Sequence, residues 1–392
     1  MTYAGTNKGG TAAIVAAERL VTRNRVAAFR DGTSIPPEQV IATFRASLDR
    51  IMGEAGLWDE TLAAYAFLQA GGDYAEAVHL LRAHRSTLPR LAVSEPVDAR
   101  SMQILRRIVP AHRSPDGPQL LGATVDYTAR ILRRPGEGDP LPIVDDISAQ
   151  QPPEYADEPF QRYSDFLRER DLLAPHEPHD DPEPIDLALN PPALPAPRSA
   201  LLSAMSLAET GGLVGMWYRS ILGPDGYADE SVTLGEVRHG TVALDVTHPH
   251  TGKPVRIGSL RVSETECFSH LDERGEDPSR FQAGYGMALG HNERKTIAMA
   301  NMDLAATRYA GTDEGDSLQQ LIMLTTDGLA SNGFLEHLKL PHYVTFRSML
   351  DRALAARAEQ QPAQQAPQQP ELTDQAGDLD DVRDIQKVGQ PA

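Results

Sequence analysis

The chain has 392 residues, of which 41% are hydrophobic, and a formal net charge of −18 at pH 7. This length supports a sizeable core and predicts two domains, whereas the acidic excess argues against nucleic-acid binding as the main task. The single cysteine, Cys267, excludes an internal disulfide framework and favours a reducing compartment. We find neither a signal peptide nor a run of roughly 20 apolar residues, so we expect a cytoplasmic protein without membrane contact.

A helical N-terminal domain is predicted over residues 1–134. Val40, Phe44, Leu48 and Ile51 form an apolar stripe with helical spacing. Helical patterning continues in four further segments: Asp59–Ala70, Asp73–Leu88, Val97–Val109 and Gln119–Arg133.

An acidic, proline-rich connection follows over residues 135–197. Its content of Pro, Asp and Glu disfavours long helices and central strands, and one helical island, Phe160–Leu173, interrupts it. After residue 357 the composition changes to Gln, Pro, Ala and Asp, which predicts a disordered tail over residues 358–392.

Residues 198–357 are predicted to form an α+β domain. Apolar and polar residues alternate from Val242 to Val246 and again at Val255 and Ile257, on either side of a turn-like stretch, which indicates an antiparallel hairpin. Helices are predicted around this hairpin at Arg198–Leu222, Asn292–Tyr309, Leu318–Ala330 and Val344–Arg357. The expected fold class is therefore α+β: a helical N-terminal domain followed by a mixed domain with a small antiparallel sheet.

The glycine-rich string Gly284-Tyr285-Gly286 and the residues after it predict an anion site. The chain enters a helix at Asn292, its expected N-cap, and Arg294 and Lys295 lie in the first turn, where cations oppose the helix dipole. A phosphate at this entrance would resolve the conflict, because free N–H groups and both side chains would converge on it. The alternative is that both side chains point into water.

A histidine pair near the C-terminal end predicts a metal site. Pro341 forbids a continuous helix through His337 and His342, so both imidazoles can converge on one metal ion. Two ligands leave a zinc site open, and the others must come from water, substrate or another chain. The alternative is a hydrogen-bonded pair with a structural role.

Several polar strings in the N-terminal half are ordinary when taken singly, as a solvated helix face, a proline-terminated turn or a capped helix. With the two stretches above they form an ordered set: Lys8-Gly9-Gly10, Leu80-Leu81-Arg82-Ala83, Ala92-Val93-Ser94-Glu95-Pro96, Gln119-Leu120-Leu121-Gly122, Asp126-Tyr127-Thr128, Gly284-Tyr285-Gly286, Glu293-Arg294-Lys295, Ala298-Met299-Ala300 and His337-Leu338-Lys339-Leu340-Pro341-His342-Tyr343. Taken together and in this order, the strings resemble the signature segments of the PhnI family over residues 8–347.

The resemblance implies a subunit of the bacterial carbon–phosphorus lyase core complex. That complex converts ATP, bound with magnesium, and an alkylphosphonate to ribose 1-alkylphosphonate 5-triphosphate and releases adenine. The family's subunit is similar to a nucleosidase and works with the G, H and L subunits; the J subunit later cleaves the carbon–phosphorus bond, and the K subunit is a further expected partner. The resemblance also implies that His337 and His342 bind a divalent metal, expected to be zinc, shared with the J subunit.

The implied reaction narrows the roles of the matching residues. Displacing a nucleobase at C1′ passes through an oxocarbenium-like state, which needs a carboxylate near the ribose and cations for the triphosphate. Glu95 and Asp126 are the carboxylate candidates. The expected substrate-binding residues are Lys8, Arg82, Gln119, Tyr127, Arg294, Lys295 and Lys339. Two alternatives stay open: a free-standing nucleosidase acting on purine nucleotides, and a non-catalytic scaffold subunit that shares a metal site.

Overall fold

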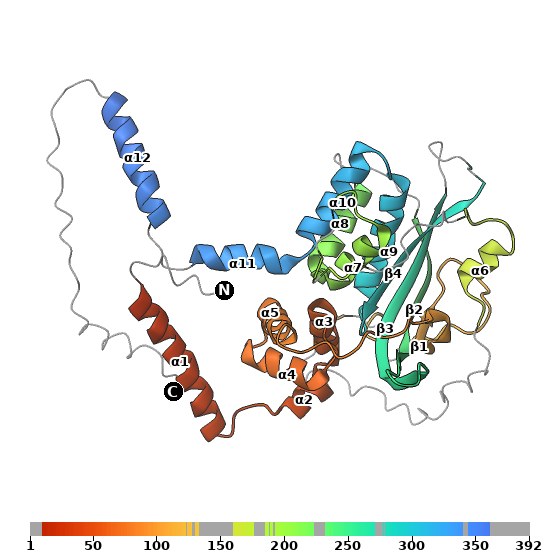
Figure 1. The fold of residues 1–392 in the computed structure, drawn as a ribbon, viewed down its shortest axis with the longest axis horizontal. Coiled ribbons are helices and arrows are strands. Elements are labelled where there is room, and N and C mark those ends of the chain that lie inside the picture. The colour runs from red at the N-terminus through yellow and green to blue at the C-terminus, as the bar shows by residue number, and fades with distance from the viewer. Residues whose placement is uncertain are drawn as a thin grey trace. The chain divides into compact units, whose positions relative to one another are not determined.

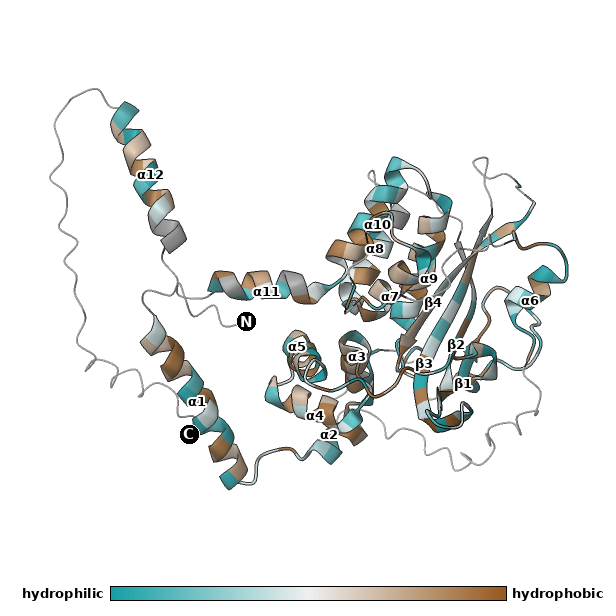
Figure 2. Cartoon of the chain, in the orientation of Figure 1, coloured by the Kyte–Doolittle hydropathy of each residue, from teal (hydrophilic) through white to brown (hydrophobic). Residues whose placement is uncertain are grey.

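The computed structural model describes residues 10–122, 124–127, 130–132, 160–175, 185–187, 189–190, 193–222, 232–270, 277, 279–339 and 344–360. The chain divides into two compact units, residues 28–339 and the two ends, 1–27 with 340–392. The ends contribute most of α1 (Thr11–Arg30), which buries none of its residues, and α12 (Val344–Gln360). Figure 2 shows hydrophobic and hydrophilic residues interspersed along α1. No helix within the described ranges is long and apolar enough to cross a membrane.

The N-terminal helices of the larger unit form a compact cluster, as the sequence predicted. They are α2 (Pro37–Thr43), α3 (Arg45–Ala55), α4 (Glu60–Gln69) and α5 (Tyr74–Arg85). Asp59 and Asp73 cap α4 and α5 by accepting hydrogen bonds from Leu62 N (2.8 Å) and Glu76 N (3.0 Å). Three residues of the predicted apolar stripe, Val40, Leu48 and Ile51, are buried in the core with Met52 and Leu81. The fourth, Phe44, lies at the break between α2 and α3 and is 42% exposed.

A four-stranded antiparallel sheet follows, in the order β1-β2-β3-β4 (Figure 1). Its strands are β1 (Gln103–Ile108), β2 (Val232–Thr247), β3 (Pro254–His270) and β4 (Phe281–Leu289). The sheet confirms the α+β class and the predicted β2–β3 hairpin.

Two helices predicted in the N-terminal half do not form in the described residues, so these predictions are wrong. The segment Val97–Val109 contains a short 3-10 turn, Ala99–Ser101, and strand β1, which pairs with β2. The described residues of 119–133 form no helix, and Leu120 makes an isolated bridge with Arg107 instead. Tertiary pairing with β2 therefore overrides the local helical spacing.

Helix α9 (Glu293–Arg308) packs across one face of the sheet, against β3 and β4. The glycines expected at a phosphate entrance lie inside β4, so that expectation is wrong. A Cβ at Gly284 would overlap the carbonyl oxygen of Ala300, and one at Gly286 would overlap that of Thr296. These glycines serve the close approach of a helix to a strand rather than a ligand.

Further helices cover α9. Helices α7 (Arg198–Leu207) and α8 (Thr210–Leu222) replace the single predicted helix, with a break at Ala208. Similarly, α10 (Asp313–Thr325) and α11 (Gly328–Lys339) replace the predicted Leu318–Ala330. Met205, Leu213, Met302 and Ile322 bring α7, α8, α9 and α10 into one core cluster.

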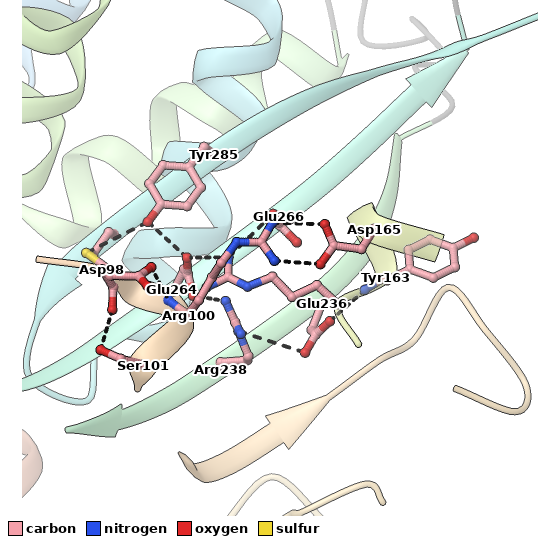
Figure 3. Close-up of polar contacts among 12 residues, drawn as sticks. Asp98, Arg100, Ser101, Tyr163, Asp165, Glu236, Arg238, Glu264, Glu266 and Tyr285 are labelled. Atoms are coloured by element: carbon pink, nitrogen blue, oxygen red, sulfur yellow. Dashed lines mark hydrogen bonds and ion pairs between the residues drawn. The ribbon is translucent and has the colours of Figure 1, made fainter. Parts of the chain in front are cut away.

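The opposite face of the sheet buries a charged layer beneath α6 (Tyr163–Arg168) (Figure 3). Glu264 accepts hydrogen bonds from Arg238, from Arg162 at 3.1 Å and from the Tyr285 hydroxyl at 3.0 Å. Glu236 pairs with Arg107 at 2.8 Å. Buried charges are tolerated when they are paired in this way, so the layer fixes α6 against the sheet and ties β1 to β2.

Candidate functional site

A pocket of about 490 Å³ opens between the N-terminal helical cluster and helices α8 and α11. Its wall combines charged residues from α3 and α5 with the first turns of α8 and α11. The lining residues are Arg50, Glu54, Asp73, Tyr74, Ala75, Val78, Arg82, Glu209, Gly212, Asp327, Gly328, Leu329 and Asn332. A pocket of this size and mixed polarity can hold a nucleotide-sized ligand.

Arg82, a predicted substrate-binding residue, lies in this wall. Its Nε and Nη2 donate to the carbonyl oxygen of Glu54 at 3.0 and 2.7 Å, and Nη2 also donates to that of Leu207 at 2.8 Å. Its Nη1 lies 2.7 Å from Asp327 Oδ2. The guanidinium therefore joins α3, α7 and the start of α11, and its position is fixed by several bonds at once.

Arg50 forms the second positive group of the pocket. Its Nε lies 2.8 Å from Glu54 Oε1 and its Nη2 2.5 Å from Glu209 Oε1. The guanidinium also lies over the Tyr74 ring, 4.9 Å from the ring centroid. Sequence reasoning missed this residue, since α3 carries no motif of its own.

Three helices begin at the pocket, and an acid caps each one. Asp73 caps α5. Glu209 accepts hydrogen bonds from Gly211 N at 3.0 Å and Gly212 N at 2.5 Å at the start of α8. Asp327 accepts one from Leu329 N at 3.2 Å at the start of α11. At two of these helix starts the sequence has an acidic residue followed closely by glycine, and this pattern could have indicated the caps.

Lys295 and Arg294 do not form a common anion site. Lys295 is completely buried and donates from Nζ to the carbonyl oxygen of Ser206 at 2.7 Å. Burial lowers the pKa of Lys295 to about 8. Arg294 is exposed, because neighbouring positions on a helix point about 100° apart. The expectation that both converge on one phosphate is wrong.

Asp126 lies in a second cluster, with arginines. Arg106, which is buried, donates from Nη2 to Asp126 Oδ2 at 2.7 Å and from Nε to Glu293 Oε1 at 2.6 Å. A hydrogen bond from Thr124 lowers the pKa of the Asp126 carboxyl, and three positive charges lower it further: Arg106, Arg130 and Arg294. Asp126 is therefore an ionised carboxylate whose negative charge is balanced by the surrounding arginines.

Two stacked histidines adjoin this cluster. The rings of His239 and His291 lie 4.3 Å apart with an interplanar angle of 12°. Burial, with the neighbouring charge of His291, lowers the pKa of His239 to about 4, so this ring is neutral at pH 7. Because a carbonyl oxygen can only accept, the proton of this ring is on Nδ1, which donates to the carbonyl oxygen of Val262 at 2.9 Å. His291 Nε2 lies 3.5 Å from Glu293.

The structure does not bring the two predicted carboxylates together. Glu95 lies at the end of β2, where it accepts a hydrogen bond from Thr247. Arg106, the partner of Asp126, lies on β1 and pairs in register with His239 of β2, the strand that also carries Thr247. His239 and Thr247 are eight positions apart along β2, a distance of about 26 Å.

The other predicted substrate-binding residues lie elsewhere. Gln119 exchanges two hydrogen bonds with the backbone of Val109, at 2.9 and 3.1 Å, which gives it a structural role. Tyr127 is 65% exposed. Lys339 pairs with Glu336 on the surface of α11 at 2.5 Å, and Lys8 lies outside the described residues.

The histidine pair is only partly described. His337 belongs to α11, which ends at Lys339, before Pro341. The side chain of His337 and all of His342 lie outside the described residues. Within the ranges that are described, no group of three or more His, Cys, Asp or Glu side chains could hold a metal ion. The metal site stays a prediction.

Comparison with known proteins decides the family. Residues 4–360 match the family described as "Bacterial phosphonate metabolism protein (PhnI)". The chain belongs to the PhnI family. It is 35% identical over 372 residues to the alpha-D-ribose 1-methylphosphonate 5-triphosphate synthase subunit PhnI of Rhizobium meliloti (strain 1021), covering 91% of this chain and 95% of that one.

Two further relatives show similar identity. The protein of the same name from Escherichia coli (strain K12) is 35% identical over 363 residues, with 90% of this chain and 98% of the relative covered. The protein described as "Putative C-P lyase subunit protein HtxH" of Stutzerimonas stutzeri is 36% identical over 371 residues, with 91% of this chain and 97% of the relative covered. The likeness to PhnI proteins therefore extends over nearly the full length.

Proposed function

We propose that this chain is the I subunit of a carbon–phosphorus lyase complex that exchanges the adenine of ATP for an alkylphosphonate at ribose C1′. The product is ribose 1-alkylphosphonate 5-triphosphate. The proposal is carried by the 35% identity to two proteins named as subunits of a ribose 1-methylphosphonate 5-triphosphate synthase, over nine-tenths of this chain.

The Arg50–Arg82 pocket is the proposed nucleotide site. Its volume suits a nucleotide, and its two guanidinium groups suit the paired oxygens of phosphates. Both arginines are held by bonds to fixed groups, so they are already oriented when substrate arrives. The Tyr74 ring gives the same wall an aromatic surface against which a base can pack.

Asp73 is the carboxylate that we assign to the ribose in place of Glu95. It lines the pocket and caps α5 with one oxygen, and no ion pair neutralises it among the described residues. Its charge can therefore offset the positive charge that develops at C1′ as the base departs. Asp126 is less suited to this role, because Arg106 and its neighbours neutralise it.

Metal and partners belong to the same proposal. Magnesium bound to ATP neutralises part of the triphosphate charge. His337 and His342 hold a divalent ion, zinc in our proposal, together with ligands from the J subunit. The G, H, L and K subunits complete the assembly. Two histidines leave a zinc site incomplete, which favours a site that is completed by ligands from another subunit.

The test is exchange by the assembled complex. The chain is purified with its G, H and L partners and incubated with magnesium, ATP and methylphosphonate, and adenine and the ribosyl product are measured. We expect adenine release coupled to ribosyl methylphosphonate triphosphate. Equal adenine release without phosphonate, giving ribose triphosphate, would show a free nucleosidase instead. Unchanged exchange in Asp73→Asn and Arg82→Gln would show that this pocket is not the site of exchange and would favour the scaffold alternative.

A further inference from the structure

The two arginines of the pocket are held by acids that also cap helices. Arg50 Nη2 lies 2.5 Å from Glu209, which accepts hydrogen bonds from the first turn of α8. Arg82 Nη1 lies 2.7 Å from Asp327, which accepts one from Leu329 N of α11. Each carboxylate fills a point where a guanidinium and helix N–H groups meet, an arrangement that also binds phosphate.

We propose that the Glu209 and Asp327 carboxylates hold the places of two phosphate groups and leave Arg50 and Arg82 when a polyphosphate enters the pocket. This proposal rests on the proposed function, because it identifies the polyphosphate as that of the nucleotide substrate.

The charge of the pocket requires such an exchange. Four carboxylates and two guanidinium groups line the wall, so a triphosphate that entered the pocket unchanged would meet net repulsion. Glu54 is buried and fixed by hydrogen bonds from Arg50 and from both Thr210 N and Oγ1. The side chains of Glu209 and Asp327 are 28% and 47% exposed, so both can turn toward water.

Glycines leave room for the exchange. A Cβ at Gly212 would lie 3.2 Å from Glu209 Oε2, and a Cβ at Gly328 would lie 2.8 Å from Glu209 Cβ. The side chain of Glu209 therefore packs closely against the glycines at both helix starts, and a larger residue at either position would crowd it. When the carboxylate leaves, the same space lets a phosphate approach the backbone N–H groups.

Because two carboxylates, those of Glu209 and Asp327, are displaced, the pocket favours ligands with two or more linked phosphates. A single phosphate displaces one carboxylate at a time, whereas linked phosphates displace the second within the same bound complex. The predicted ligand class is therefore a nucleoside di- or triphosphate, with nucleosides and monophosphates disfavoured.

Removing the competing charge provides the test. Asp327→Asn keeps an oxygen that accepts the Leu329 N–H bond, and Glu209→Gln keeps one of the two oxygens that accept from Gly211 N and Gly212 N, but neither variant neutralises its arginine. Binding of inorganic tripolyphosphate and of ATP to the full chain in its complex should tighten about two- to fivefold in each variant, while adenosine binding stays unchanged. Asp165→Asn is the matched control, since it breaks an exposed ion pair with Arg100 (2.7 Å) away from the pocket.

A double-mutant cycle separates the proposal from a general charge effect. With Arg82→Gln in the background, Asp327→Asn should no longer tighten tripolyphosphate binding. Equal tightening with and without Arg82 would overturn the proposal, as would unchanged or weaker binding in folded Glu209→Gln and Asp327→Asn. Because tripolyphosphate has no base or ribose, this result is independent of whether the complex exchanges adenine.

Discussion

Replacing Lys295 with methionine should change how stability depends on pH. The side chain is completely buried, and burial lowers its pKa from 10.5 to about 8. The unfolded chain keeps the proton up to about pH 10.5. Between these values the unfolded state binds more protons, so the free energy of unfolding of the wild type rises with pH. Below pH 8 the native state carries the full cost of a buried charge.

The expected size follows from the pKa difference. Raising the pH from 8 to 10.5 should increase the unfolding free energy of the wild type, relative to Lys295→Met, by about 3 kcal/mol. At pH 7 the variant should also lose a charge-assisted hydrogen bond to Ser206, a contribution of about 1.5–3 kcal/mol. Urea unfolding of both proteins at pH 7.5, 8.5, 9.5 and 10.5 measures the difference.

The matched control is Lys339→Met, which removes an exposed lysine paired with Glu336. Its unfolding free energy should stay parallel to that of the wild type over the same pH range. If the curves for Lys295→Met and wild type were also parallel, the buried ammonium would not be titrating near pH 8, and the reasoning from burial would be refuted.

Three further outcomes are expected. Arg82→Lys should weaken ATP binding about tenfold in calorimetric titrations, because an ammonium cannot reproduce a guanidinium that bonds in several directions. Gly286→Ala should lower the free energy of unfolding by about 2–4 kcal/mol in urea titrations, because its Cβ would overlap the Thr296 carbonyl. His337→Ala and His342→Ala should reduce the metal content of the complex and growth on methylphosphonate, while adenine exchange stays largely intact.

Each of these three predictions can be refuted by a specific result. Wild-type ATP affinity in Arg82→Lys would remove that residue from the substrate site. For the glycine, Gly258→Ala is the control, since an added Cβ there meets nothing within 4 Å; equal stability of the two alanine variants would contradict the close approach of α9. Wild-type metal content with normal growth in both histidine variants would remove the metal site.

The sequence predicted those elements whose pattern is local. The β2–β3 hairpin follows from strict alternation around Val242–Val246, and α9 follows from its N-cap position and spacing. Strand β1 was missed because Ile104, Leu105 and Ile108 also fit a helical spacing, and only pairing with β2 decides between the two. Strand β4 was missed because its glycines resemble a loop, although they serve its contact with α9.

The pocket was only partly predictable for the same reason. Arg82 stood out within a family string, but its partner Asp327 is 245 residues away along the chain. Arg50 pairs with Glu209 across 159 residues. No periodicity or spacing rule reports such pairs, because they arise from the packing of α3 and α5 beside α8 and α11. Adjacent residues also diverge: Arg294 and Lys295 share a string but face different surroundings.

The order of strands in the sheet also has a consequence for synthesis on the ribosome. Gln103 of β1 and Thr241 of β2 face each other although 138 residues separate them. At typical elongation rates of about 5–20 residues per second, β1 waits on the order of ten seconds for its partner. During that interval the α2–α5 cluster can fold from local contacts, while β1 keeps an unpaired edge. Asp126 follows Arg106 within 20 residues, whereas Arg107 still lacks its later acidic partner, Glu236. The charges of both arginines can keep the unpaired strand soluble before they become buried.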